Sequence, residues 1–325
     1  MAAQGRVGWD NAPGMWGMGA MRMLMQTNNF SYGLVTPAVG LAMSFLGALL
    51  GLRCATRARA YDGWARARWL LLAGASLGLG CVWVGHFIDM LGFTVAGEQV
   101  RYNVPETLAS ALLGVAVTCG GLFIAGYSDR TSRLVLGGLL VGLGIASMHY
   151  TGMAAMRMPG AVSYAPVWLL ASAAVAVAGG TAALWSALRL RGIWPTIGAS
   201  LITAAAVGGM HYTGMAAMRM SAQQTAMAVQ GATALGFLLP LILVISFLTS
   251  MLIFILALAP TEDEIREDTA LRVRLAELER QHDWERPRSF LCRSIQAVRV
   301  VSQPNQPLPL IPAPQATARL DAPHR

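Results

Sequence analysis

An eleven-residue segment occurs twice in the chain, each time at the end of a long apolar run. Met148 to Met158 read MHYTGMAAMRM, and Met210 to Met220 repeat these residues without a change, 62 positions later. A third, degenerate copy, GHFIDMLGF from Gly85 to Phe93, precedes the first perfect copy by 63 positions when His86 is aligned with His149. Self-similarity at a fixed period indicates a repeated structural unit. A histidine-containing segment repeated so strictly also points to a site.

The repeats lie in a chain that is too apolar for a soluble domain. Of its 325 residues, 55% are hydrophobic and 12% are charged, whereas about a quarter of the residues in a soluble domain are charged. We therefore predict an all-α, polytopic membrane helix bundle of about seven transmembrane helices, built from two-helix repeats. Runs of the length that crosses a hydrocarbon core of about 30 Å occur at 34–52, 70–93, 108–126, 134–156, 166–188, 197–218 and 236–259.

The arginines predict the orientation of these spans, because basic residues are retained on the cytoplasmic side of a membrane. One set of flanking segments holds Arg53, Arg57, Arg59, Arg66, Arg68, Arg130, Arg133, Arg189 and Arg191. The alternate set holds only Arg6, Arg22, Arg101, Arg157 and Arg219. We therefore predict that the N-terminus lies outside and the C-terminus in the cytoplasm. The net charge of +8 follows from this topology and does not indicate nucleic-acid binding.

Four regions are expected along the chain. A Met-rich extracytoplasmic segment (1–33) precedes the seven-span membrane domain (34–259), which is followed by a charged cytoplasmic helix (260–290) and a disordered Pro-rich tail (291–325). The charged segment carries Leu271, Leu275 and Leu278 at helical spacing. This spacing fits either a solvated helix or a contact within a homodimer.

The predicted topology brings the three histidines to one depth. The second, fourth and sixth spans all run outward, and each carries its copy of the motif in its last third. On a helix of 3.6 residues per turn, positions i, i+4 and i+7 share a stripe. The stripes are His149, Met153 and Met156 in the second copy and His211, Met215 and Met218 in the third; the first copy offers His86 and Met90.

Imidazole and thioether groups are uncharged ligands that suit Cu(I) and suit Mg²⁺ or Ca²⁺ poorly. The eight residues of the three stripes therefore predict a metal site for copper in the outer leaflet. Methionine is also an ordinary packing residue, and the methionines alone are more typical of a packed helix interface than of a metal site. The histidines favour a site, because ionisable groups inside a membrane are costly and usually functional.

Asp89 lies three residues after His86, at the position that Gly152 and Gly214 occupy in the other copies. We expect it to orient His86 as a carboxylate partner of a metal-bound imidazole, or to take part in a proton relay. An alternative is that it lies high enough in its span to contact water. The glycines border the histidine stripe and would let a neighbouring helix approach closely.

The tetrapeptide within the perfect repeats, together with HFIDMLGF and the segment beginning FSYGLVTPAVG, resembles the MHYT-domain family of bacterial integral membrane proteins. The resemblance covers roughly residues 27–260. It implies a sensory module of the bacterial plasma membrane. In that family the module is proposed to hold a metal ion, copper, and thereby to sense oxygen, carbon monoxide or nitric oxide. The matching positions are Met148, His149, Met153, Met210, His211, Met215, His86 and Met90.

Many members of that family continue into domains that make or break cyclic di-GMP, which this sequence does not contain, so we expect the signal to leave through a cytoplasmic signalling partner. Two other hypotheses remain open: a copper-handling transporter, and a haem protein with His149 and His211 as axial ligands. We expect no enzymatic activity, because no nucleophile–base set or phosphate-binding loop is found in the sequence.

Overall fold

The computed structural model describes residues 27–95, 98–127, 130–158, 161–221, 230–258 and 267–281. The chain divides into two units, Met1–Ala259 and Pro260–Arg325. In the second unit, residues 267–281 form a helix with exposed side chains. Most of the Met-rich segment and the whole Pro-rich tail, for which we made predictions, lie outside the described residues.

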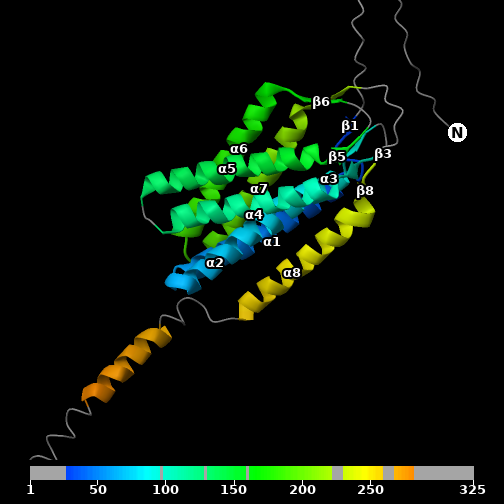
Figure 1. Cartoon of the computed structure of the whole chain (residues 1–325). Helices are drawn as coiled ribbons and strands as arrows, with labels where there is room; N and C mark the ends of the chain where they lie inside the picture. Colours follow the sequence, from blue (N-terminus) through cyan, green and yellow to red (C-terminus); the bar gives the residue numbers. More distant parts are fainter. Residues whose placement is uncertain are drawn as a thin grey trace, which may run out of the picture. The chain divides into compact units, whose positions relative to one another are not determined.

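The first unit is a bundle of long helices (Figure 1). Its helical segments are α1 (Val35–Ala58), α2 (Gly63–Ala75), the π-helical segment η1 (Ser76–Trp83), α3 (Val84–Leu91), α4 (Val104–Gly126), α5 (Thr131–Ala154), α6 (Pro166–Arg189), α7 (Ile193–Ala217), the π-helical segment η2 (Ala234–Leu238) and α8 (Leu239–Leu258). Because α2, η1 and α3 are continuous, as are η2 and α8, the described part of the chain has seven helices long and apolar enough to cross a membrane. The prediction of an all-helical, seven-span bundle is confirmed.

The loop between the first two spans is shorter than the sequence predicted. We expected the arginine-rich segment 53–69 to connect the first two spans, but α1 continues to Ala58 and α2 already begins at Gly63. Arginines within and just after these helices donate to main-chain carbonyls of neighbouring segments. Arg59 donates to the carbonyl oxygens of Leu188 and Leu190, at 2.7 and 2.6 Å.

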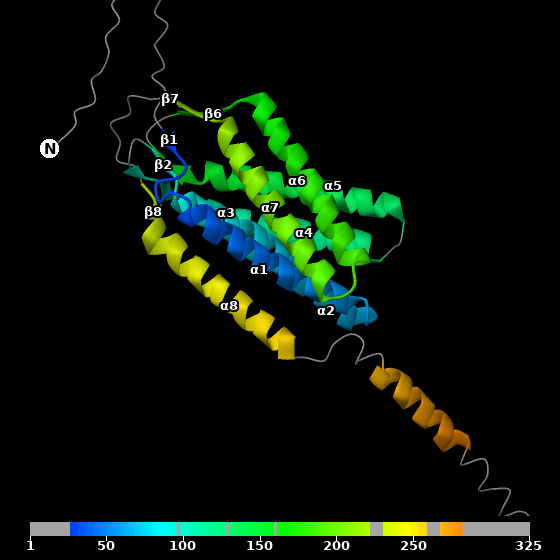
Figure 2. The same cartoon turned by 180° about the vertical axis from the view of Figure 1, so that it is seen from behind.

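The spans form a closed ring in the order of the sequence. The α2–η1–α3 span packs against α4, α4 against α5, α5 against α6, and α6 against α7; α1 then closes the ring between α7 and the α2–η1–α3 span. Each pair of consecutive spans ends in one copy of the motif, so the repeat in sequence is a repeat in space. α8 packs outside the ring, along α1 (Figure 2).

Short strands lie together at one end of the bundle, which we call the strand end. They are β1 (Thr27–Asn28), β2 (Thr94–Val95), β3 (Glu98–Gln99), β4 (Arg101–Tyr102), β5 (Met156–Arg157), β6 (Ala161–Tyr164), β7 (Met218–Ser221) and β8 (Ala232–Thr233). They pair in the orders β1-β2-β3, β5-β4-β8 and β6-β7, always antiparallel. The helices that carry the motif, α3, α5 and α7, all end here.

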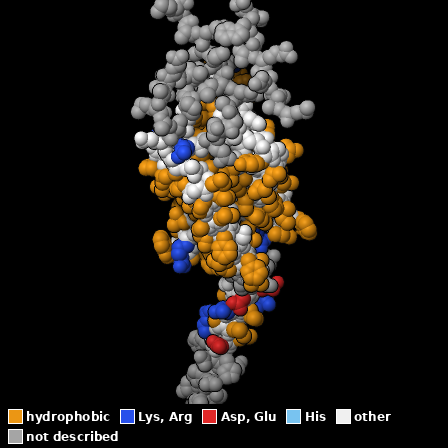
Figure 3. All heavy atoms as spheres, turned by 90° about the vertical axis from the view of Figure 1, so that its right-hand side faces the viewer, with side chains coloured by type: hydrophobic (Ala, Val, Ile, Leu, Met, Phe, Trp, Pro, Cys, Tyr) orange, Lys and Arg blue, Asp and Glu red, His pale blue; other side chains and the backbone are white. Residues whose placement is uncertain are grey.

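The opposite end of the bundle carries the arginines of the helix connections, and we call it the basic end. Between the two ends, hydrophobic side chains cover the surface in a broad band (Figure 3). Exposed members of this band include Leu112, Leu143, Leu170, Ile202 and Phe247. An apolar surface between a basic end and a polar strand end fits a bilayer.

Candidate functional site

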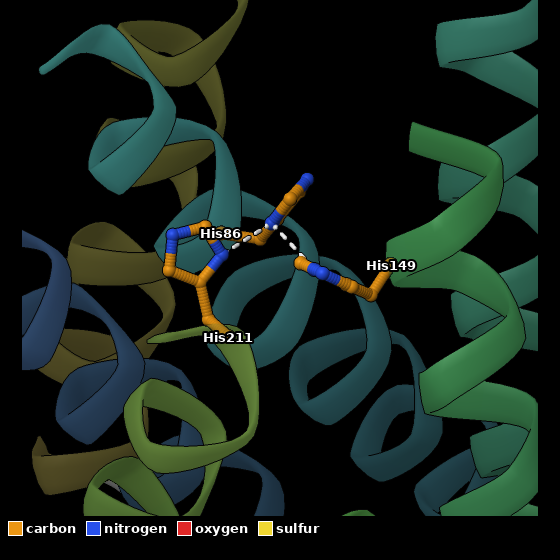
Figure 4. A group of neighbouring side chains, drawn as sticks. All are labelled: His86, His149 and His211. Atoms are coloured by element: carbon orange, nitrogen blue, oxygen red, sulfur yellow. Dashed lines mark hydrogen bonds between the residues drawn. The ribbon is translucent and has the colours of Figure 1, made fainter. Parts of the chain in front are cut away.

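Three histidines from three different helices meet inside the strand half of the bundle. His86 lies on α3, His149 on α5 and His211 on α7, and all three are at least 98% buried. Nδ1 of His86 lies 2.9 Å from Nδ1 of His211 and 3.2 Å from Nδ1 of His149 (Figure 4). One nitrogen from each ring lies within 4.8 Å of the others. The degenerate first copy thus supplies the central histidine.

An aromatic residue follows each histidine and contacts its ring edge-on. The ring centroids are 4.6 Å apart for His86 and Phe87, 4.9 Å for His149 and Tyr150, and 4.8 Å for His211 and Tyr212. The Tyr150 hydroxyl also shares a hydrogen bond of 2.7 Å with the Ser172 hydroxyl on α6. These aromatic contacts fix the orientation of each imidazole. We did not predict them, although an aromatic residue at this position in all three copies was a signal.

Two of the motif glycines provide the surfaces on which histidines of the preceding copy rest. A Cβ atom added to Gly152 would lie 3.0 Å from Nε2 of His86, and one added to Gly214 would lie 2.6 Å from Nε2 of His149. His86 and His149 therefore present Nδ1 to the centre and Nε2 to the backbone of the next motif helix. The predicted close approach at these glycines is observed, and what approaches is an imidazole.

The arrangement leaves polar atoms without partners whichever way the protons are placed. A neutral imidazole carries one N–H. Nε2 of His86 and of His149 have no hydrogen-bond partner among the described residues. If the protons are on Nε2, three Nδ1 lone pairs face one another; if they are on Nδ1, buried Nε2 lone pairs are unpaired. Buried polar atoms without partners are costly, so a ligand that accepts the Nδ1 lone pairs would stabilise the cluster.

The spacing of the nitrogens suits such a ligand. Imidazole nitrogens bind a transition metal at about 2.0 Å, so two nitrogens on one ion lie roughly 3.3 Å apart. The Nδ1 separations of 2.9 and 3.2 Å are close to this value. Two of the three nitrogen separations thus match those of ligands on one ion, and the same two contacts also fit hydrogen bonds between neighbouring imidazoles.

The methionines of the motif fall into two groups. Met90, Met153 and Met215, each four residues after a histidine, are buried near the ends of their helices. The prediction that Met156 and Met218 continue the helical stripe is wrong. α5 ends at Ala154 and α7 at Ala217, and the chain then enters β5 and β7, where Met156 pairs with Tyr102 and Met218 with Tyr164.

Asp89 is buried, but it does not bond to His86 in the described structure. Its Oδ1 atom packs against Gly40 of α1, and Tyr212 of α7 is its polar neighbour. Both Oδ1 of Asp89 and the Tyr212 hydroxyl lack a hydrogen-bond partner among the described residues. The carboxylate therefore lies between α1 and α7 and not at the centre of the three histidines.

Strands and tyrosines separate the histidines from the outer surface. Tyr102 of β4 is 1% exposed and contacts Phe87 edge-on, with 5.9 Å between ring centroids. Burial raises the pKa of the Tyr102 phenol above its ordinary value, and burial likewise raises the pKa of Tyr164. Both phenols therefore stay neutral at physiological pH. The strand β5 beside Tyr102 is tied to α4 by an ion pair of 2.6 Å between Arg157 and Glu106.

Comparison with known proteins matches two stretches, 78–138 and 142–200, to the family MHYT, described as a bacterial signalling protein N-terminal repeat. The chain is 39% identical over 193 residues to the bifunctional diguanylate cyclase/cyclic di-GMP phosphodiesterase MucR of Pseudomonas aeruginosa, covering 58% of this chain and 28% of MucR. It is 36% identical over 164 residues to the cyclic di-GMP phosphodiesterase NbdA of the same organism, covering 47% of this chain and 20% of NbdA.

A third relative, the signaling protein YkoW of Bacillus subtilis, is 26% identical over 162 residues, which cover 46% of this chain and 19% of YkoW. The chain thus spans less than a third of the length of these relatives. No solved structure matches it. The matched repeats contain His86 and His149 and lie within the seven-span bundle, so this part of the chain carries the MHYT repeat of bacterial signalling proteins.

Proposed function

We propose that this chain is a sensor in which His86, His149 and His211 hold a copper ion near the outer face of the plasma membrane. The observation that carries the proposal is the convergence of three buried Nδ1 atoms from three repeats. When bound, copper would supply affinity for diatomic gases and one-electron redox chemistry. The side chains of this chain fix the position of the ion and exclude water from it.

The chemistry of the surroundings favours copper in its monovalent state. All three histidines are uncharged ligands, and the methionines beside them offer thioethers, which select soft ions such as Cu(I). The Asp89 carboxylate is not part of the cluster. A monovalent ion brings the smallest charge into a low-dielectric interior, where charge burial is costly. We propose Met90, Met153 and Met215, each one helical turn after a histidine, as the thioether ligands.

An apolar cavity about one helical turn from the histidines suits a small uncharged ligand. Its lining includes Val82, Ile145 and Val207, each four residues before a histidine. The cavity has a volume of about 30 Å³ and is lined by residues of η1, α4, α5, α6 and α7, including Met210, which directly precedes His211. Its lining threonines, Thr118 and Thr203, donate their hydroxyls to helix carbonyls. Water needs several polar partners to occupy a cavity. A dry space of this size suits oxygen, carbon monoxide or nitric oxide.

The ring of repeats gives a route for the signal. An ion held by α3, α5 and α7 joins all three two-helix units, so a change in its ligands alters the packing of every unit. The arginine bias favours a cytoplasmic location for the basic end. We propose that a cytoplasmic signalling partner reads this change, consistent with the cyclic di-GMP enzymes that MucR and NbdA are named for.

The two other hypotheses fit the geometry less well. The three imidazoles contact one another, with ring centroids 4.8, 4.9 and 5.3 Å apart, which leaves no room between them for the macrocycle of a haem. A copper transporter needs a path of ligands on both sides of the site. On the side of the histidines that faces the basic end lies the apolar cavity, which offers an ion few ligands. An ion bound by the histidines would therefore stay there and not move on through the bundle.

The test is metal analysis of the detergent-purified protein after loading with Cu(I) under anaerobic conditions. We expect near-stoichiometric copper in the wild type, loss of the copper in His149→Ala and His211→Ala, and retention in His282→Ala, whose histidine lies in the charged tail sequence. Carbon monoxide added to the loaded protein should give an infrared C–O band that shifts with the ¹³C isotope. Equal copper in all four proteins would overturn the metal site, and a missing C–O band would overturn gas binding alone.

A further inference from the structure

A cleft outside the ring lies at the basic end, between α1, α7 and α8. Its volume is about 170 Å³, and its lining is apolar except for one residue: Leu49, Leu50 and Arg53 from α1, Ile193 from α7, and Ile253, Leu256 and Ala257 from α8. Ile193 and Ala257 are exposed, so the cleft opens to the surface. It is smaller than a typical pocket for a drug-sized molecule, and it faces the hydrophobic band of the bundle.

Arg53 differs from the other arginines that are buried or half-buried at this end. Arg57 donates to the carbonyl of Leu256 and lies over the ring of Trp69. Arg59 donates to two carbonyls, and Arg66 donates to the carbonyl of Gly126. Arg53 is half-buried, and its guanidinium has no acceptor among the described residues. A guanidinium has five donors and always carries a charge, and the nitrogens of Arg53 are not among the buried unpaired atoms, so this guanidinium can bind an anion at the mouth of the cleft.

A second positive feature borders the same cleft. α7 begins at Ile193, and its N-cap residue is Gly192, which has no side chain to accept from the first N–H groups of the helix. A helix N-terminus carries a partial positive charge. Arg53 and this helix end therefore give the cleft a positive rim around an apolar interior.

We propose that the cleft binds one phospholipid with an anionic headgroup. The phosphate would accept from Arg53, and part of one acyl chain would lie along Leu49, Ile253 and Ala257. A membrane lipid fits these observations because it combines a strong bidentate acceptor for arginine with a hydrocarbon chain, and because it reaches the cleft from the bilayer. The site binds α8 to the ring through the lipid and is independent of the histidines.

The test is native mass spectrometry of the detergent-purified chain titrated with palmitoyl-oleoyl phosphatidylglycerol or with phosphatidylcholine of the same acyl chains. We expect the wild type to prefer phosphatidylglycerol by about fivefold, the contribution of one surface cation to binding an anionic lipid. Arg53→Gln should abolish this preference. Arg133→Gln is the control, since Arg133 is exposed at the same end and does not line the cleft.

A second variant tests the apolar part of the cleft without changing any charge. Ile253→Trp should fill the cleft and lower the binding of both lipids while the chain stays folded, as judged by its elution in size-exclusion chromatography. The proposal is overturned if Arg53→Gln keeps the preference for phosphatidylglycerol, or if Arg133→Gln loses it equally. It is also overturned if Ile253→Trp binds both lipids as the wild type does.

Discussion

The orientations of the three imidazoles depend on the residues that contact them. Each ring is held edge-on by the aromatic residue that follows it, and two rings rest on a glycine of the next repeat. Methionine and glycine are ordinary residues of membrane helices, so the specificity of the motif comes from its histidines and from the contacts between copies. Substitutions at Gly214 and at the motif tyrosines test these contacts separately from general helix packing.

Gly214→Ala should disturb the site, whereas Gly208→Ala on the same helix should not. The added methyl group at position 214 would lie 2.6 Å from Nε2 of His149, but at position 208 it would meet no atom within 4 Å. Overpacking of a core costs about 1–3 kcal/mol. We expect Gly214→Ala to lower the thermal stability and to weaken copper binding by about tenfold, measured by competition with a chromophoric Cu(I) chelator. Equal copper affinity in the two variants would show that His149 does not depend on this contact.

The two motif tyrosines should respond differently to loss of the hydroxyl. Tyr150→Phe removes a hydrogen bond of 2.7 Å to Ser172 and should cost about 1 kcal/mol. Tyr212→Phe removes a buried hydroxyl that has no partner among the described residues and should be neutral or slightly stabilising. Thermal unfolding of the detergent-solubilised variants measures both. A comparable loss in Tyr212→Phe would mean that this hydroxyl is bonded to Asp89.

The helices could be predicted from the sequence more accurately than the segments that join them. Apolar runs of about 20 residues identified all seven spans, because the hydrocarbon thickness sets their length. The strands could not be predicted in this way. β5 and β7 are short and begin inside the repeated motif, so Met156 and Met218 were assigned to helices. The extension of α1 to Ala58 was also missed, because it depends on carbonyl acceptors from distant segments.

The packing of α1 on η1 depends on one glycine. A Cβ atom at Gly47 would lie 2.3 Å from the Cys81 nitrogen and 2.4 Å from the Gly80 carbonyl carbon, both main-chain atoms. Backbone cannot move aside as a side chain can, so Gly47→Ala should lower the free energy of unfolding by about 3 kcal/mol. Gly198→Ala in α7, where a Cβ would meet open space, is the control. Size-exclusion chromatography after heating compares them, and equal midpoints would contradict this packing.

At the scale of the whole molecule, the repeat period of two spans explains why the three motifs lie at the same end of the bundle. Copies separated by two helices end on the same side, and this much could be predicted from the repeat period. The closed ring could not be predicted, since it depends on α1 packing against both α7 and the α2–η1–α3 span. It could likewise not be predicted that His86, from the degenerate copy of the motif, contacts both other histidines.

The orientation in the membrane that the arginines predict can be tested with single cysteines in a cysteine-free background. A cysteine at Phe30, which is exposed at the strand end, should react with a membrane-impermeant maleimide in intact cells. A cysteine at Trp194, which is exposed at the basic end, should react only after the cells are permeabilised. The reverse pattern would place the histidines in the inner leaflet.

X-ray absorption spectroscopy at the copper edge examines the convergence of the three imidazoles in the loaded protein. We predict a first shell that contains nitrogen and shows the multiple scattering of imidazole, with the imidazole contribution reduced in His149→Ala and in His211→Ala. A sulfur-only shell, or a shell that neither substitution changes, would contradict a metal centre built from His86, His149 and His211.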